Sequence, residues 1–227
     1  MGFLASVAAW LGDPARWSGS DGIPNRLLEH VQVSGLALVI AAAIALPLGV
    51  GLGHLGRGGF FAINIAGFGR ALPSFALIAL ALPVSFALGQ GLGFFPTLLA
   101  MIPLGLPPII TNSFVGVRGV DRDLVEAARG MGLSERQIIG AIELRLAAPL
   151  IFAGIRSAAV SIVATATLGA LVAGGGLGRY IVDGLALQDY ERLFAGALLV
   201  ALLAVGTELF FALLERSSRH TQTGGAT

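Results

Sequence analysis

Side chains that could carry out covalent or acid–base chemistry are sparse in this 227-residue chain. It has no cysteine, which excludes disulfides, thiol catalysis and thiolate metal sites. It also has no lysine, so it lacks the residue that a Walker A loop places on nucleotide phosphates. The three histidines, His30, His54 and His220, are isolated and lack metal-ligand spacing. We therefore predict no catalytic centre, no metal site and no cofactor bound by this chain.

Charged and polar residues are instead concentrated in one short segment between two long apolar runs. Asp123 is spaced from Glu126 as in a capping box, where each side chain bonds the other's backbone at a helix start. Gly132 can end that helix, because glycine tolerates the left-handed C-terminal position. Ser134 and Gln137 form a second capping box. We expect a short helix, a glycine hinge and a second helix at the membrane surface.

The first of these helices has a face suited to packing against another protein. Four small or apolar residues share one side of it over about two turns. They are Leu124, Ala127, Ala128 and Met131. A solvated connecting loop is the alternative, but it would need neither two caps nor such a face. The pattern favours a docking element.

The flanking elements are apolar enough to lie in a bilayer. Hydrophobic residues make up 56% of the chain and charged residues 12%, against roughly 25% charged in an ordinary soluble domain. Five runs have about 20 apolar residues, which is enough to cross a bilayer. They lie near 31–53, 60–82, 94–116, 146–172 and 193–214. We predict an all-α polytopic membrane protein with about five transmembrane helices.

The distribution of arginine sets the expected orientation. Segment 117–145 carries five arginines and the C-terminal end with the tail 217–227 carries Arg216 and Arg219, whereas the four arginines on the opposite side are outnumbered by six carboxylates. The positive-inside rule then places both in the cytoplasm and segment 1–30 outside it. Residues 31–216 form the transmembrane domain. The apolar stretch 3–11 is too short to span, so we expect a helix lying at the interface.

Prolines inside the apolar runs indicate helices packed within a bundle or along a cavity. Pro47 lies in the first run, Pro73 and Ser74 interrupt the second, and the third has three prolines before Asn112. Proline in a membrane helix frees carbonyls that neighbours must satisfy. Three broken spans favour a transport pathway, and kinking for packing is the alternative. The glycine-rich segment 173–184 suits a re-entrant turn or a short helix at the outer mouth.

Polar side chains within the runs complete a candidate pathway. Three hydroxyl residues of the fourth run lie four apart on one helix face, as in a packing seam or a pore lining. Arg70 and Arg156 are charged residues in or near the hydrocarbon region, where a charge is a functional candidate by default. The candidate pathway residues are Arg70, Pro73, Ser74, Asn112, Ser157, Ser161 and Thr165.

Three pieces of the charged loop follow a specific spacing: Glu126-Ala127-Ala128, then Gly132, then Ile142-x-Leu144. This pattern resembles the EAA loop of permeases from binding-protein-dependent ABC importers. In that family, the loop's coupling helix inserts into a groove on a cytoplasmic ATPase. One departure is that Arg145 stands where the family usually has proline, so the entry angle into the next span can differ. The resemblance assigns ATPase coupling to Glu126, Ala127, Ala128, Gly132, Leu133 and Ile142.

Further motifs, from about residue 30 to residue 215, are similar to the permeases of osmoprotectant importers. They are Leu72–Leu77, Gly119–Asp121, Glu126–Gly132, Ala153–Arg156, Thr165–Ala170 and Gly174–Gly178. Those permeases carry glycine betaine, choline, carnitine and related quaternary amines. The resemblance thus implies a permease subunit for compatible solutes, without a nucleotide site of its own, in a bacterial cell membrane.

The same resemblance implies a set of partners. They are a second permease subunit, the same or homologous, a cytoplasmic ATPase dimer that binds ATP and Mg, and an extracytoplasmic solute-binding protein. A lipid bilayer surrounds the complex, and no nucleic acid is involved. A permease for methionine or another amino acid is the alternative within the superfamily. A self-contained channel or secondary transporter and a lipid-modifying membrane enzyme are the alternatives of other classes.

Overall fold

The computed structural model describes residues 2–56, 59, 64 and 73–223, with side chains described up to residue 215. All regular elements in these residues are helices. In chain order they are α1 (Phe3–Gly12), η1 (Pro14–Trp17), α2 (Ile23–Leu55), α4 (Ser74–Ala87), α5 (Phe94–Arg118), α6 (Arg122–Gly130), α7 (Glu135–Ile138), η2 (Ile139–Glu143), α8 (Leu144–Thr165), η3 (Ala166–Val172), α9 (Gly178–Ala186) and α10 (Tyr190–Thr223).

Four stretches of helix are long and apolar enough to cross a bilayer, and they match four of the five predicted runs. They are Ile23–Leu55, Phe94–Arg118, Glu135–Val172 and Tyr190–Glu215. Most of the remaining run, 60–82, which is the second along the chain, lies outside the described residues. Its described part belongs to α4, whose 14 residues are too short to span alone. The all-α membrane fold is therefore confirmed.

Two boundaries differ from the prediction. α2 begins at Ile23 and not near residue 31, because Pro24 favours a helix start. The hydropathy pattern missed these residues because the first turns of α2 are polar. The fourth run is not a single α-helix. At Thr165 it changes from α8 to the 3₁₀-helix η3, which passes so close to α5 that a Cβ on Gly169 would lie 2.7 Å from the Thr97 hydroxyl oxygen.

Proline does not break α2 or α5, so the expectation of three broken spans is wrong for these two. α2 continues through Pro47, and α5 continues through all three of its prolines. Pro73 is the N-cap of α4, and residues 65–72 before it lie outside the described part of the chain. Pro107 of α5 is buried inside the bundle, whereas Pro47 of α2 is exposed.

The core forms where α5 packs between α2 and α8. Glycines bring the backbones into direct contact: a Cβ on Gly49 of α2 would lie 2.7 Å from the Ile110 carbonyl oxygen. On the other side of α5, a Cβ on Gly154 of α8 would lie 2.8 Å from the Pro108 carbonyl oxygen. In a membrane, such close approach provides the packing that holds helices together.

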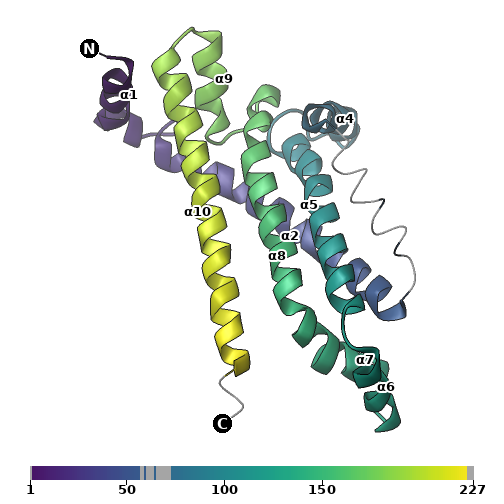
Figure 1. Cartoon of the computed structure of the whole chain (residues 1–227). Helices are drawn as coiled ribbons and strands as arrows, with labels where there is room; N and C mark the ends of the chain where they lie inside the picture. The colour runs from purple at the N-terminus through teal and green to yellow at the C-terminus, as the bar shows by residue number, and fades with distance from the viewer. Residues whose placement is uncertain (1, 57–58, 60–63, 65–72, 224–227) are drawn as a thin grey trace.

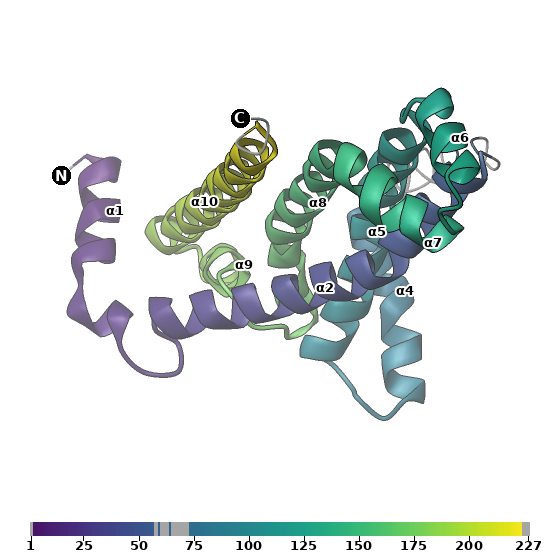
Figure 2. The same ribbon diagram turned by 90° about the horizontal axis from the view of Figure 1, so that it is seen from below.

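The molecule has two distinct ends. Figure 1 shows α5, α8 and α10 running side by side, and Figure 2 shows α2 crossing beneath them. α6 and α7 project from one end, toward which the C-terminal part of α10 also points (Figure 1). α1 and α9 lie at the opposite end. There Val7 and Trp10 of α1 are buried against a cluster that includes Tyr180 and Ala195, so this helix packs on protein.

Candidate coupling loop and membrane sites

α6 is capped by Asp121, two residues before the predicted cap. Asp121 Oδ1 accepts a hydrogen bond from the backbone N–H of Asp123 at 2.9 Å. The predicted capping box of Asp123 with Glu126 is therefore wrong, because Asp123 already lies in the first helical turn. Its carboxylate still stabilises the helix there, since a helix N-terminus carries partial positive charge.

The inner face of α6 packs against the rest of the loop. Val125 and Ala128 are buried in a small core with Val120 and Ile138. Leu133 and Ile142 pack against the same core. Ala128 has no exposed surface, so the expectation that it shares the docking face is wrong.

The outer side of α6 leaves apolar side chains in the open. Leu124 is 45% exposed and Met131 74% exposed, and Ala127 is exposed between them. Spacings of three and four residues place these three on one stripe of the helix. Glu126 is exposed as well. We call Leu124, Ala127 and Met131 the outer stripe of α6.

Gly132 ends α6 as predicted. Its φ is +86°, in the left-handed region that favours glycine. The backbone N–H of Leu133 donates to the Ala128 carbonyl at 3.1 Å, and that of Gly132 donates to the Arg129 carbonyl at 2.9 Å. This pair of bonds is a Schellman motif, in which an apolar residue after the glycine packs back on the helix. Leu133 fills that position.

The second predicted cap is present, but the helix that follows it is irregular. Gln137 Oε1 accepts from the backbone N–H of Ser134 at 2.8 Å and also from its hydroxyl. α7 starts there, and a π-helical turn, Ile139–Glu143, joins it to α8. The apolar spacing of this stretch fits an ordinary α-helix equally well, so the π-turn could not be predicted. Such turns are frequent at functional sites.

A chain of charged groups ties the loop to the end of α2. His54 Nδ1 lies 2.8 Å from Glu143 Oε2, and His54 Nε2 lies 3.1 Å from Glu135 Oε2. Arg129 donates to both oxygens of Glu135, at 2.8 and 3.0 Å. Hydrogen bonding to Glu135 raises the pKa of the Arg129 guanidinium above its ordinary value. Sequence reasoning missed this cluster because His54 is 89 residues from Glu143, and no local spacing marks it.

The described candidate pathway residues are spread over three helices, α4, α5 and α8. Arg70 lies outside the described residues. Pro73 is exposed and Ser74 half-buried at the start of α4. Asn112 lies at the α5–α8 contact, where its Nδ2 donates to the Pro108 carbonyl oxygen of its own helix at 2.8 Å.

The hydroxyl stripe of α8 faces away from the rest of the described chain. Ser157 and Ser161 are exposed, and Thr165 is half-buried. A packing seam within this chain is therefore wrong for the first two. A cavity of about 390 Å³ does lie between α2, α8 and α10, but none of the candidate pathway residues lines it.

Arg156 is paired across two membrane helices. Its Nε lies 3.3 Å from Glu208 Oε1 and its Nη1 lies 3.2 Å from Glu215 Oε2, both on α10. Paired charges are the usual arrangement for ionisable residues in a membrane helix. This ion-pair group explains how the membrane-spanning part of α10 retains Glu208 and Glu215.

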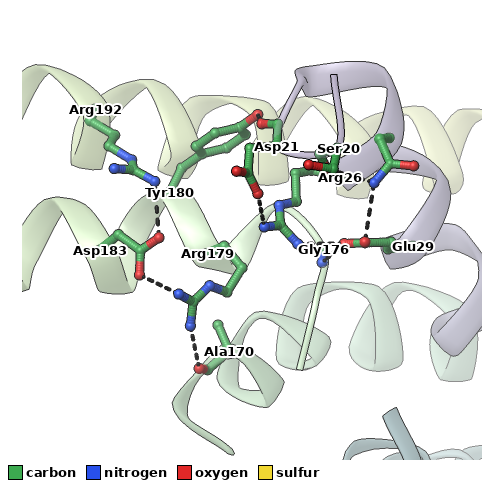
Figure 3. A network of polar contacts seen from close by, with 11 residues as sticks. Ser20, Asp21, Arg26, Glu29, Ala170, Gly176, Arg179, Tyr180, Asp183 and Arg192 are labelled. Carbon is green, nitrogen blue, oxygen red and sulfur yellow. Dashed lines mark hydrogen bonds and ion pairs between the residues drawn. The ribbon is translucent and has the colours of Figure 1, made fainter. Parts of the chain in front are cut away.

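The glycine-rich segment near α9 forms a turn and then a short helix, as one of the two predicted alternatives. Figure 3 shows how polar groups hold it. Glu29 Oε2 accepts from the backbone N–H of Gly176 at 2.8 Å, and Arg26 donates to the same oxygen at 2.9 Å. The Tyr180 hydroxyl donates to the Asp21 carbonyl oxygen at 2.6 Å. Burial raises the pKa of the Tyr180 phenol, which keeps this donor protonated.

A second ionic group extends along the same end of the molecule (Figure 3). Asp183 accepts from Arg179 at 2.8 Å and from Arg192 at 2.9 Å. Because Arg192 belongs to α10, this group joins α9 to the start of the last membrane helix. The start of α2, the glycine turn, α9 and α10 are thus linked into one cap opposite α6.

Comparison with known proteins identifies relatives over most of the chain. Residues 31–220 match the family described as binding-protein-dependent transport system inner membrane component. The chain is 36% identical to the choline transport system permease protein OpuBB of Bacillus subtilis (strain 168), covering 83% of this chain and 84% of that protein. It is 34% identical to the carnitine transport permease protein OpuCB of Listeria monocytogenes, covering 87% of this chain and 90% of the relative.

A solved structure agrees with these relatives in fold. The chain is similar to a chain of the inward-facing MetNI methionine ABC transporter, with a TM-score of 0.74 and 19% identity. The match covers 86% of this chain and 95% of that chain. The long apolar helices and the loop that carries α6 are consistent with the family match. The chain therefore belongs to the family of inner membrane components of binding-protein-dependent transport systems.

Proposed function

We propose that this chain is the membrane-spanning subunit of an ATP-driven importer for compatible solutes such as glycine betaine, choline or carnitine. The observation that carries the solute class is identity above 30%, over more than four fifths of the chain, to permeases named for choline and carnitine. The alternative solute is methionine or another amino acid. Methionine is the solute named for the MetNI transporter, but at 19% identity the likeness to that structure concerns the fold alone.

In this proposal, α6 is the coupling helix. Its outer stripe of Leu124, Ala127 and Met131 enters a groove on the ATPase, and Glu126 borders that contact. Ala128, Leu133 and Ile142 act from the inner side by holding α6 on the loop core, and Gly132 sets the turn behind it. Exposed apolar side chains on a capped helix at the end of the bundle support this assignment.

The pathway is then built with a second permease subunit. Ser157 and Ser161 are exposed on one face of α8 in the described chain, and small hydroxyl residues are typical of helix–helix contacts in membranes. We assign them, with Thr165, to the surface facing the second subunit or the solute. Arg70, Pro73 and Ser74 are proposed to join them, whereas Asn112 acts by packing α5 on α8.

The remaining parts of the complex follow from the same proposal. An ATPase dimer binds ATP and Mg on the side of segment 117–145, and a solute-binding protein docks on the opposite side, near segment 1–30. The tail 217–227 is cytoplasmic, and residues 31–216 form the domain that spans the bacterial inner membrane and carries the cytoplasmic loop 117–145. This chain holds no nucleotide, and no nucleic acid takes part.

The solute is tested by uptake into proteoliposomes that contain this chain with its ATPase and binding protein. Radiolabelled glycine betaine, choline, carnitine and methionine are compared at equal concentration, each with and without internal ATP. We expect ATP-dependent uptake of at least one quaternary amine and none of methionine. Uptake of methionine alone would overturn the solute assignment while leaving the transporter class intact.

A further inference from the structure

We propose that His54 is a positioning residue for ATP-driven transport, because it fastens the end of α2 to the loop that carries α6. Movement of α6 would then be transmitted directly to a membrane helix on the far side of α5. This inference rests on the proposed coupling role of α6. It assigns a role to a residue that contacts neither the solute nor the ATPase groove.

The contact between His54 and Glu143 is buried, whereas the Glu135 and Arg129 side chains are 53% and 41% exposed. The His54 side chain is 10% exposed and the Glu143 side chain 4% exposed. Glu143 is the last residue of the π-turn, and Glu135 is the first residue of α7. Arg129 of α6 completes the chain through Glu135. One histidine of α2 is therefore linked to all three helical pieces of the loop.

The ring of His54 is held by both of its nitrogens. A neutral imidazole has a single N–H and cannot donate to two carboxylates at once. Each ring nitrogen lies within hydrogen-bond distance of a carboxylate oxygen, so one nitrogen donates in the neutral ring and both donate in the protonated ring. Hydrogen bonds to ionised groups are roughly twice as strong as neutral ones. The joint is thus strong and fixed in direction.

The end of α2 is rigid enough to transmit a displacement. At Gly53 it approaches α5 so closely that a Cβ would lie 2.8 Å from the Cβ of Val117. The helix ends at Gly56 in a left-handed conformation, with the Arg122 guanidinium 2.6 Å from the position of a Cβ. The C-terminal end of α2 therefore meets both ends of the loop. It contacts Arg122 at the start of α6, and its His54 contacts the π-turn.

The test measures how many ATP molecules are hydrolysed for each solute imported. The full complex of this chain, its ATPase and its binding protein is reconstituted with the solute that the wild type takes up. The variants are His54→Gln, which keeps one donor, Glu143→Gln, and the double variant. Gln32→Leu, at an exposed position of the same helix, serves as the control.

We expect His54→Gln to leave ATPase co-purification unchanged and to raise the ATP-to-solute ratio about tenfold, within the usual range of coupling between sites. The double variant should show no higher ATP-to-solute ratio than His54→Gln alone, since both single changes remove the same contact, the one between positions 54 and 143. A wild-type ratio in His54→Gln would overturn the proposal. So would a proportional fall of uptake and hydrolysis, because that indicates fewer folded complexes and not weaker transmission.

A parallel variant separates this inference from the proposed function. Ala127→Leu changes the outer stripe of α6 and leaves the His54 joint intact. If Ala127→Leu retains wild-type ATPase co-purification and uptake, the coupling role of α6 fails. If it loses both while His54→Gln keeps a wild-type ratio, α6 couples and only the role of His54 is refuted.

Discussion

Replacing Gly132 with alanine should loosen the C-terminal end of α6 without disturbing any packing. A Cβ added at Gly132 meets no atom within 4 Å, so the cost comes from the backbone alone. The φ of +86° is unfavourable for a residue with a Cβ by roughly 1–2 kcal/mol. A change of that size shifts a local opening equilibrium by about 5–30-fold. The bonds at risk are those that close the Schellman motif.

Gly130 provides a matched control two residues earlier. It also has no atom within 4 Å of an added Cβ, but it is the last residue of α6 and has no positive φ. Alanine is favoured over glycine in a helix by about 1 kcal/mol, so Gly130→Ala should be neutral or stabilising. Hydrogen–deuterium exchange of the α6 amides measures both variants. Equal exchange in Gly130→Ala and Gly132→Ala would refute the role given to the turn.

Three other outcomes are expected. Gly154→Ala should destabilise the purified protein by about 1–3 kcal/mol in denaturant unfolding, since its Cβ would lie 2.8 Å from the Pro108 carbonyl oxygen, whereas Gly35→Ala meets nothing and should be neutral. An impermeant thiol reagent on intact cells should modify Gln188→Cys but not Ser134→Cys, and the opposite result would reverse the topology. The purified chain alone should show no ATPase activity above background, and robust hydrolysis would contradict an importer subunit without its own nucleotide site.

The membrane helices could be predicted from sequence because the bilayer requires long apolar runs, whatever the tertiary contacts are. Gly132 and the Ser134 cap could be predicted for a similar reason, since each depends only on residues within one turn. The cap of α6 was misplaced because Asp121 and Asp123 both satisfy the residue preference of an N-cap. Local pattern alone did not decide between them.

Features that depend on distant contacts could not be predicted. Burial of Ala128 depends on Val120 in the turn before α6 and on Ile138 of α7. His54 looked isolated because its partner Glu143 lies 89 residues away in the sequence. The hydroxyl stripe of α8 could be a packing seam or an exposed surface, depending on which helix lies beside it. In the structure, α10 covers a different side of α8.

The central claim is that the outer stripe of α6 docks on the ATPase, and photo-crosslinking tests it most directly. The chain has no cysteine, so single Ala127→Cys, Met131→Cys and Leu187→Cys variants can each carry one benzophenone-maleimide label. Leu187 is 69% exposed at the opposite end of the molecule and serves as the control. Irradiation of the assembled importer should link the ATPase to positions 127 and 131 and not to position 187. An ATPase crosslink at 187 with none at 127 or 131 would contradict the account.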